Sequence, residues 1–251
     1  ASEWSAALAL FDSLRSSNLE ADAFGFSAAL SACGKGGHWA LALEMLSDMA
    51  ARGVAPDLVC LNGALAALGR ARLWEETLQH LQLLRSGNGI AGDVVSYNTT
   101  ITACAESSQW PRALALFEEM RAGDVLPTTI SFNAAITALW ADGADRGPAA
   151  RELYDQLLSA NLEPGVDTFC TLLAALLPGG HWQSAVAILQ EMEERSLGPH
   201  GQVTNTVMHL LAKSGQPAMV QQLLRKAAET EVAETGPEAA ERRKAKEGEV
   251  S

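Results

Sequence analysis

The chain has 251 residues, of which 48% are hydrophobic and 19% are charged, and it carries a formal net charge of −12 at pH 7. The apolar share is enough for a sizeable core, but no apolar run reaches the roughly 18 to 20 residues of a membrane crossing. We therefore expect no membrane partner. The acidic net charge at first disfavours nucleic acid, because phosphate contacts need Lys and Arg.

The cysteines and the known catalytic motifs give no sign of an enzyme. The four cysteines are too far apart for the close ligand pairs of zinc or for a dense disulfide framework: Cys33, Cys60, Cys104 and Cys170. We expect them to be reduced thiols packed as small apolar groups. Phosphate-loop, zinc-protease and deaminase motifs are absent from the sequence, so we predict no catalytic residues, no metal and no cofactor.

A tryptophan recurs along the chain at nearly constant spacing. Trp4, Trp39, Trp74 and Trp110 are 35, 35 and 36 residues apart, and Trp182 continues the frame after a place held by Pro148. Apolar residues follow these positions with the i, i+3, i+4, i+7 spacing of one helix face, as at Ala42, Met45, Leu46 and Met49. Periods of this length are typical of stacked helical arrays.

A second helical pattern precedes the outer one in each unit, and Pro and Gly separate the resulting pairs. These patterns lie at 26–37, 97–108, 132–143 and 204–215. In chain order we expect a partial repeat with an outer helix only, five hairpin repeats, a degenerate last repeat, and a charged tail whose composition is typical of disorder. Their ranges are 1–22, then 23–57, 58–93, 94–128, 129–165 and 166–200, then 201–228, and finally 229–251.

One hairpin cannot bury both of its faces, so neighbouring hairpins must stack on each other. The predicted fold class is therefore all-α, an α-solenoid superhelix of stacked antiparallel helix hairpins. One set of helices lies inside and the other lies outside.

Several short motifs then resemble the pentatricopeptide repeat family rather than the related tetratricopeptide arrays. They are SYN and SFN at 96–98 and 131–133, the A-L-x-L-F-x-x-M pattern at 113–120, and G-x-x-P-D at 53–57. Members of that family are typically organellar proteins that bind single-stranded RNA and read one base per repeat. The resemblance implies a location in the chloroplast or mitochondrion and an influence on RNA processing, stability or translation.

In the family pattern the second residue of each repeat packs against a base. These residues are apolar in four repeats, namely Phe24, Val59, Val95 and Ile130. Asp167 and Gln202 depart from the pattern, and the Asp167 carboxylate would repel phosphate. The alternative is that apolar residues at a helix start only make local staple contacts.

By the same resemblance, the fifth and last residues of a repeat select the base. The pairs are Ser27 with Asp57, Asn62 with Asp93, Asn98 with Thr128, Asn133 with Gly165, and Cys170 with His200. Ser with Asp implies a guanine preference, and Asn with Asp implies uracil, whereas the later pairs give no clear preference. Asn98 and Asn133 have an alternative role as groups that satisfy the backbone near a helix start.

A basic thirteenth residue is implied to meet phosphate, and Lys35, Arg70 and Lys213 hold that place. The expected inner helices are close to neutral, and the acidic excess lies on the outer helices and tail. Two functions therefore remain open: sequence-selective binding of single-stranded RNA, which we favour, and a scaffold that binds protein partners in an organellar assembly. The RNA target and the oligomeric state do not follow from the sequence.

Overall fold

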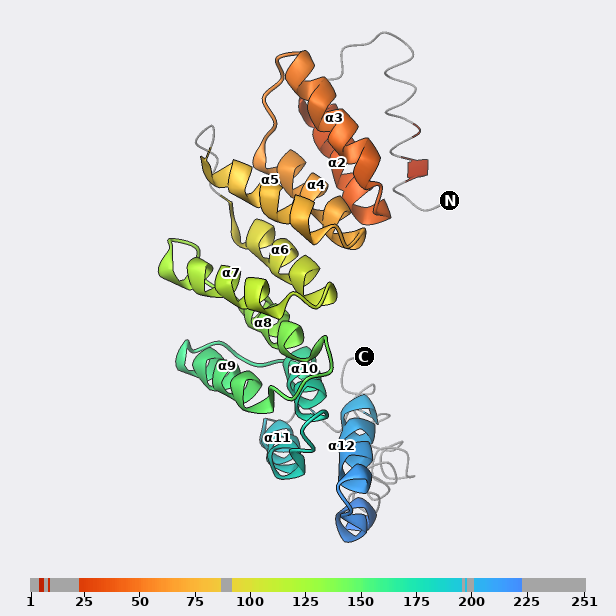
Figure 1. Ribbon diagram of the computed structural model, residues 1–251, viewed down its shortest axis with the longest axis vertical. Helices are drawn as coiled ribbons and strands as arrows, with labels where there is room; N and C mark the ends of the chain where they lie inside the picture. Colours follow the sequence, from red (N-terminus) through yellow and green to blue (C-terminus); the bar gives the residue numbers. More distant parts are fainter. Residues whose placement is uncertain are drawn as a thin grey trace, which may run out of the picture. The chain divides into compact units, whose positions relative to one another are not determined.

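The structure is a computed structural model (Figure 1), and it describes residues 5, 6, 9, 23–86, 92–195, 197 and 201–222. Most of the expected partial repeat at 1–22, the tail at 229–251 and His200 lie outside these residues. Among the helices of the described ranges, none combines the length and apolar character that a membrane crossing requires.

The described residues are helical, and they form the predicted all-α array of antiparallel hairpins. The inner helices are α2 (Ala23–Gly36), α4 (Leu58–Arg70), α6 (Val94–Glu106), α8 (Thr129–Trp140), α10 (Val166–Leu176) and α12 (Gly201–Lys213). The outer helices are α3 (Trp39–Ala51), α5 (Trp74–Ser86), α7 (Trp110–Ala122), α9 (Gly147–Ser159) and α11 (Trp182–Glu194).

The chain divides into two compact bodies, which we describe separately. The first body contains the described residues up to Ala144 together with Arg151–Glu163. The second body contains Asp145–Ala150 and the described residues from Pro164 onward. The division passes through α9 near its start.

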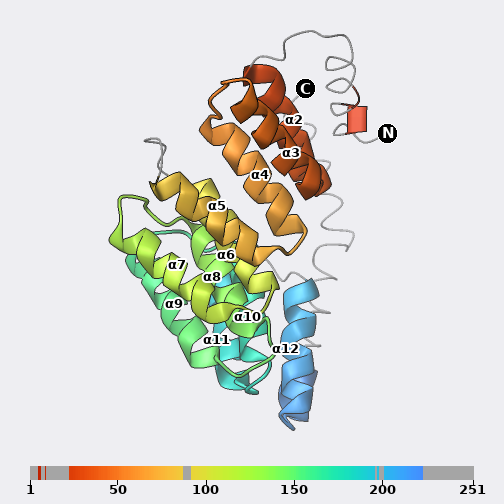
Figure 2. The ribbon, with the colours of Figure 1, turned by 45° about the horizontal axis from the view of Figure 1, so that its top comes forward.

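In the first body the inner helices form a continuous row. Helix α2 packs on α4, α4 on α6, and α6 on α8. The outer helices α3, α5 and α7 each pack on their own inner helix and on the next one, as Figure 2 shows for α3 beside α2 and α5 beside α4. In the second body α10, α11 and α12 pack on one another. This stacking buries the apolar faces that a single hairpin leaves open.

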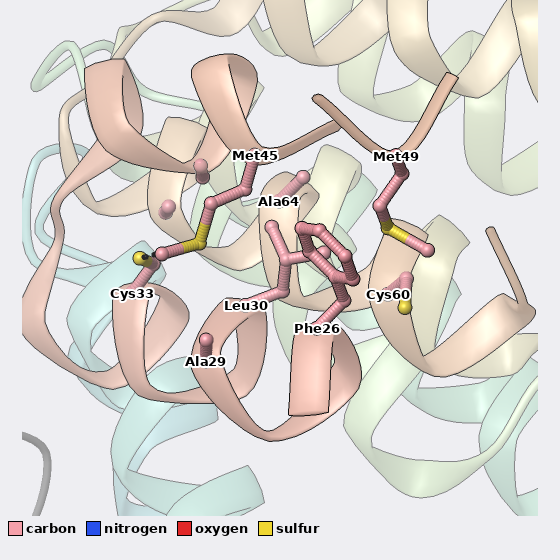
Figure 3. Close-up of a cluster of buried hydrophobic side chains, with 10 residues drawn as sticks. Phe26, Ala29, Leu30, Cys33, Met45, Met49, Cys60 and Ala64 are labelled. Atoms are coloured by element: carbon pink, nitrogen blue, oxygen red, sulfur yellow. Dashed lines mark hydrogen bonds between the residues drawn. The ribbon is translucent and has the colours of Figure 1, made fainter. Parts of the chain in front are cut away.

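The core of the first hairpin illustrates how the apolar pattern is used. Phe26 and Leu30 of α2 meet Met45 and Met49 of α3, and Cys60 of α4 closes the cluster (Figure 3). The Cys33 thiol donates to the Met45 sulfur at 4.0 Å. All four cysteines are free thiols, and three are buried, whereas Cys170 is only half-buried.

All four helical patterns read from the sequence at 26–37, 97–108, 132–143 and 204–215 start three residues too late. The helices begin at Ala23, Val94, Thr129 and Gly201, and at α6 and α8 the preceding residues Asp93 and Thr128 cap them. The Asp93 carboxylate accepts a hydrogen bond from the Ser96 N–H, and the Ser96 hydroxyl accepts one from the Asp93 N–H, which is a capping box. The second residue of each expected repeat therefore lies in the first turn of an inner helix.

The tryptophans Trp39, Trp74, Trp110 and Trp182 are the first residues of their outer helices. Helix α9 begins at Gly147, so the placement of Pro148 in the tryptophan frame was wrong by one residue. A Cβ on Gly147 would lie 2.6 Å from the His181 Cδ2, so there is no room for a larger side chain at this position.

Candidate nucleic-acid interface

Four large apolar side chains remain exposed at the start of the inner helices in the first body. They are Phe24 (81% exposed), Val59 (55%), Val95 (53%) and Ile130 (67%), the second residues of α2, α4, α6 and α8. A staple contact would bury such side chains, whereas these are accessible to a planar ligand. Asp167, at the equivalent place in α10, is also exposed.

A first hollow of about 250 Å³ lies between α2 and α4. It brings Val59 and Asn62 together with the cations Lys35 and Arg70. Its floor contains Gly34 and Gly63, which lack side chains and let the two helices approach closely. An apolar, an amide and two cationic side chains therefore share one surface.

A second hollow of about 430 Å³ continues from the first along α4, α6 and the start of α8. Arg70 lines both hollows, and Asn98 and Ile130 line the second one. Glu106, the thirteenth residue of its expected repeat, also lines it and is 4.0 Å from Arg72. The row of cations at the thirteenth position is thus interrupted by a carboxylate.

Asn62 and Asp93 are 31 residues apart and hydrogen-bonded to each other. The Asn62 Nδ2 donates to Asp93 Oδ1 at 3.1 Å, and the Ser96 hydroxyl donates to Asn62 Oδ1 at 2.6 Å. Partial burial raises the pKa of Asp93, but hydrogen bonds from the Ser96 N–H and from Asn62 outweigh it and lower that pKa below its ordinary value. Asp93 is therefore a charged acceptor at neutral pH.

Asp57 also combines two tasks. Its Oδ1 accepts from the Cys60 N–H at 2.8 Å and caps α4, while the residue stays exposed. Burial, and next a hydrogen bond with the Asp57 carboxylate, raise the pKa of the Cys60 thiol to about 11. Ser27, the expected partner of Asp57, is half-buried, and its hydroxyl acts in the opposite direction by lowering the pKa of the same thiol.

The later pairs are less complete. Thr128 caps α8, and Asn98 Oδ1 is buried with no hydrogen-bond partner among the described residues. Asn133 and Gly165 belong to different bodies. Lys213 is exposed at the end of α12 in the second body. The relation of Cys170 to His200 lies outside the described residues.

The described residues contain no group of three or more His, Cys, Asp or Glu side chains arranged to hold a metal ion. His181 Nε2 and Asp145 Oδ1 are 2.8 Å apart in the second body, and Asp145 also accepts from the Gly147 N–H. The hydrogen bond with His181 is the main cause of the lowered pKa of Asp145. The pair joins the turn before α9 to the turn before α11.

The sequence reasoning missed the third residue of each inner helix. Cys60, Ser96, Ser131 and Thr168 hold this place in α4, α6, α8 and α10, and all four are fully buried. The signal was present in the sequence as a small residue with a hydroxyl or thiol that recurs at the same place in four successive repeats.

Comparisons with known proteins agree with the fold. The model of the PPR repeat family matches residues 92–141, and the PPR repeat model matches residues 25–54 and 167–197. The crystal structure of the pentatricopeptide repeat protein PPR10 from maize is 25% identical and has a TM-score of 0.67. That match covers 93% of this chain and 32% of the maize chain, so the chain spans about a third of that relative.

Two RNA complexes are also similar in fold. PPR10 in complex with an 18-nt psaJ RNA element is 19% identical with a TM-score of 0.53, over 89% of this chain and 37% of the other. The PPR domain of protein-only RNase P 1 from Arabidopsis thaliana, in complex with tRNA, is 17% identical with a TM-score of 0.56. That match covers 64% of this chain and 84% of the other. A search of the curated proteins by sequence found no match.

Repeat models thus match in three separate places, and the maize protein is similar in fold over 93% of this chain. The chain carries pentatricopeptide repeats at residues 25–54, 92–141 and 167–197.

Proposed function

We propose that this chain binds single-stranded RNA, with successive hairpins each reading one base. The observation that carries the proposal is the meeting of three kinds of side chain along the two hollows of the first body. One continuous surface carries exposed apolar residues, amides and cations, namely Val59 and Ile130, Asn62 and Asn98, and Lys35 and Arg70. Stacking, base-edge hydrogen bonds and phosphate contacts are the three interactions that hold a single strand.

The repeats proposed as readers are 23–57, 58–93, 94–128 and 129–165, each beginning with an inner helix. Phe24, Val59, Val95 and Ile130 would pack against bases, because their exposed side chains offer apolar surface to a ring. Base selection would rest mainly on Ser27 with Asp57 and on Asn62 with Asp93, for guanine and uracil. Asn98 with Thr128 would select more weakly, as would Asn133, whose expected partner Gly165 has no side chain. The repeats 166–200 and 201–228 would contribute little beyond Lys213, since Asp167 replaces the apolar residue.

The net charge of −12 does not oppose this proposal, because the cations lie where the strand would run. Each phosphate neutralised on a single strand contributes a slope of about −0.7 in log K against log salt. Lys35, Arg70 and Lys213 together would give roughly −2. Stacking over four repeats at about 1 to 3 kcal/mol per base, less ordering costs, corresponds to roughly micromolar affinity.

Fluorescence anisotropy with a guanine-uracil RNA oligomer and its scrambled version at low salt tests the proposal. We expect tighter binding of the first oligomer and a salt slope that becomes shallower by about 1.4 when Lys35 and Arg70 are both replaced by Ala. Arg121→Ala is the matched control, because Arg121 lies on outer helix α7 and is hydrogen-bonded to Glu118 and Gln156. Equal binding of the two oligomers would refute base selection.

A second function, binding of a protein partner in an organellar assembly, is favoured by two exposed leucines away from the hollows. Leu83 is 64% exposed and Leu126 is 80% exposed. Scattered exposed leucines are common, so this function ranks below RNA binding. Native purification of the tagged chain tests it: loss of a copurifying protein in Leu126→Asp would support it, and an unchanged set of partners would count against it.

The location that the resemblance implies is the chloroplast or mitochondrion. An influence on RNA processing, stability or translation would follow from RNA binding alone, without catalysis by this chain. Imaging of the tagged protein beside markers of both organelles tests the location, and a signal confined to the cytosol would refute it.

A further inference from the structure

A buried hydroxyl or thiol recurs at the third residue of successive inner helices, as Cys60, Ser96, Ser131 and Thr168. Burying a polar group without a partner costs about 1 to 3 kcal/mol. Thr168 Oγ1 has no hydrogen-bond partner among the described residues, whereas the hydroxyls of Ser96 and Ser131 do. Capping explains part of the recurrence, because Ser96 and Ser131 form capping boxes with Asp93 and Thr128.

Ser96 makes a further contact that capping does not require. Its hydroxyl is 2.6 Å from Asn62 Oδ1, on the neighbouring inner helix α4, and 2.9 Å from Asp93 Oδ1. The hydroxyl has one proton, and Asp93 Oδ1 already accepts from the Ser96 N–H and from Asn62 Nδ2. The shorter distance and the free acceptor assign the proton to Asn62 Oδ1.

This ring of hydrogen bonds fixes the orientation of the Asn62 amide. A rotation that exchanges its oxygen and nitrogen would set Oδ1 against the Asp93 carboxylate and leave the Ser96 proton only Asp93 Oδ1, which already accepts from the Ser96 N–H. In the observed orientation Asn62 Nδ2 is 3.1 Å and 3.3 Å from the two Asp93 carboxylate oxygens, and one N–H pointing between them makes both contacts. The other N–H of Asn62 and lone pairs of Asp93 remain for a ligand. A donor beside an acceptor is complementary to the imide edge of uracil, in which a carbonyl oxygen is next to an N–H.

We propose that Ser96 is a positioning residue for base selection, which holds Asn62 in the one orientation that pairs its amide with Asp93. The proposal rests on the RNA-binding function proposed above, and it adds a third residue, from the following repeat, to the pair of Asn62 and Asp93. Cys60 holds the same place after Ser27 and Asp57, and its backbone N–H donates to Asp57 Oδ1 at 2.8 Å.

Ser131 provides a matched comparison within the same chain. It is as buried as Ser96 and forms the same capping box, with the Thr128 N–H donating to its hydroxyl at 3.0 Å. Its hydroxyl is 3.3 Å from Thr128 Oγ1, whereas Asn98 Oδ1 receives no hydrogen bond from any residue that the structure describes. Removing either hydroxyl therefore costs one capping box, but only Ser96→Ala also releases an asparagine amide.

The test selects bound RNA from a pool of random oligomers with the full chain and with Ser96→Ala and Ser131→Ala. In Ser96→Ala we expect the preference for uracil at one motif position to fall about 3-fold to 10-fold, the value of one hydrogen bond. That position should adjoin the one altered by Asp57→Asn. Ser131→Ala should leave the uracil preference unchanged, with a similar loss of thermal stability in both variants.

Ser96→Cys keeps the test decisive if Ser96→Ala does not fold, because Cys60 already occupies the same place in α4. A thiol is a weaker donor, so a smaller loss of preference is expected, and Ser96→Thr should retain it. A wild-type motif that stays unchanged in these variants overturns the role of Ser96 and leaves RNA binding intact. No enriched motif with the wild-type chain overturns both proposals.

Discussion

Gly63 of α4 lies against the backbone of Leu30 in α2, so that a Cβ on Gly63 would be 2.8 Å from the Leu30 carbonyl carbon. Gly63→Ala should therefore push the two inner helices apart and destabilise the first body by about 1 to 3 kcal/mol. Gly69 is the control on the same helix, because its Cβ would meet Thr99 at an ordinary 3.5 Å. Gly69→Ala should stabilise by roughly 0.5 to 1 kcal/mol through helix propensity. Thermal unfolding followed by circular dichroism separates the two, and equal shifts would contradict the close packing.

Asp57→Asn should change the base preference without changing the fold. Asparagine caps a helix about as well as aspartate, so the hydrogen bond from the Cys60 N–H to the capping side chain is retained. The amide adds a donor where the carboxylate only accepts. We expect the preference at the first position to move from guanine toward adenine, as read by selection from a random pool. An unchanged motif, with an unchanged melting temperature, would show that Asp57 does not touch the base.

Glu106→Gln should strengthen RNA binding. Glu106 is exposed on the second hollow beside Arg70, where it repels phosphate, and its contact with Arg72 is a 4.0 Å surface pair of little value. Removing one negative charge several ångströms from a phosphate corresponds to roughly a twofold gain in affinity in water. Anisotropy titrations at low salt measure it. Glu118→Gln makes the same charge change on outer helix α7, and an equal gain there would contradict the placement of the strand.

Asp93 should make the stability of the first body depend on pH. Its pKa in the folded chain is below the ordinary value of 3.8, because hydrogen bonds from Ser96 and Asn62 outweigh partial burial. Such a carboxylate contributes stability above the unfolded pKa, and this is lost as the pH falls through the folded pKa. Asp93→Asn keeps a cap and removes the charge. Its melting temperature should be lower than that of the wild type at pH 7, and the difference should shrink below about pH 4.

Asp124→Asn is the control for this measurement, because Asp124 is an exposed residue in the turn after α7. Its difference from the wild type should stay small and constant over the same pH range. A difference for Asp93→Asn that does not change with pH would show that the hydrogen-bonded carboxylate contributes nothing.

Much of the architecture was legible in the chain itself. Stacked hairpins were predicted from the nearly constant spacing of the tryptophans, from the Pro and Gly breakers, and from the apolar stripe at Ala42, Met45 and Met49. The side chains of this stripe are buried in the structure. The apolar period of a helix and the Pro and Gly residues that end it are local features of the sequence, so they can be recognised without the tertiary structure. The starts of the inner helices were read too late because the capping by Asp93 and Thr128 depends on backbone geometry.

The sequence by itself determined the fold class, the resemblance to pentatricopeptide repeats and the equivalent places of Phe24, Val59, Val95 and Ile130, since each depends on motifs and spacing along one chain. Only the tertiary structure decided that Ser96 reaches Asn62 across 34 residues, that Gly147 begins α9, and that Arg70 lies between two hollows. These relations depend on the distance between packed helices. The size of the residues at the contact sets that distance, and at Gly63 the absence of a side chain lets α4 approach α2 closely.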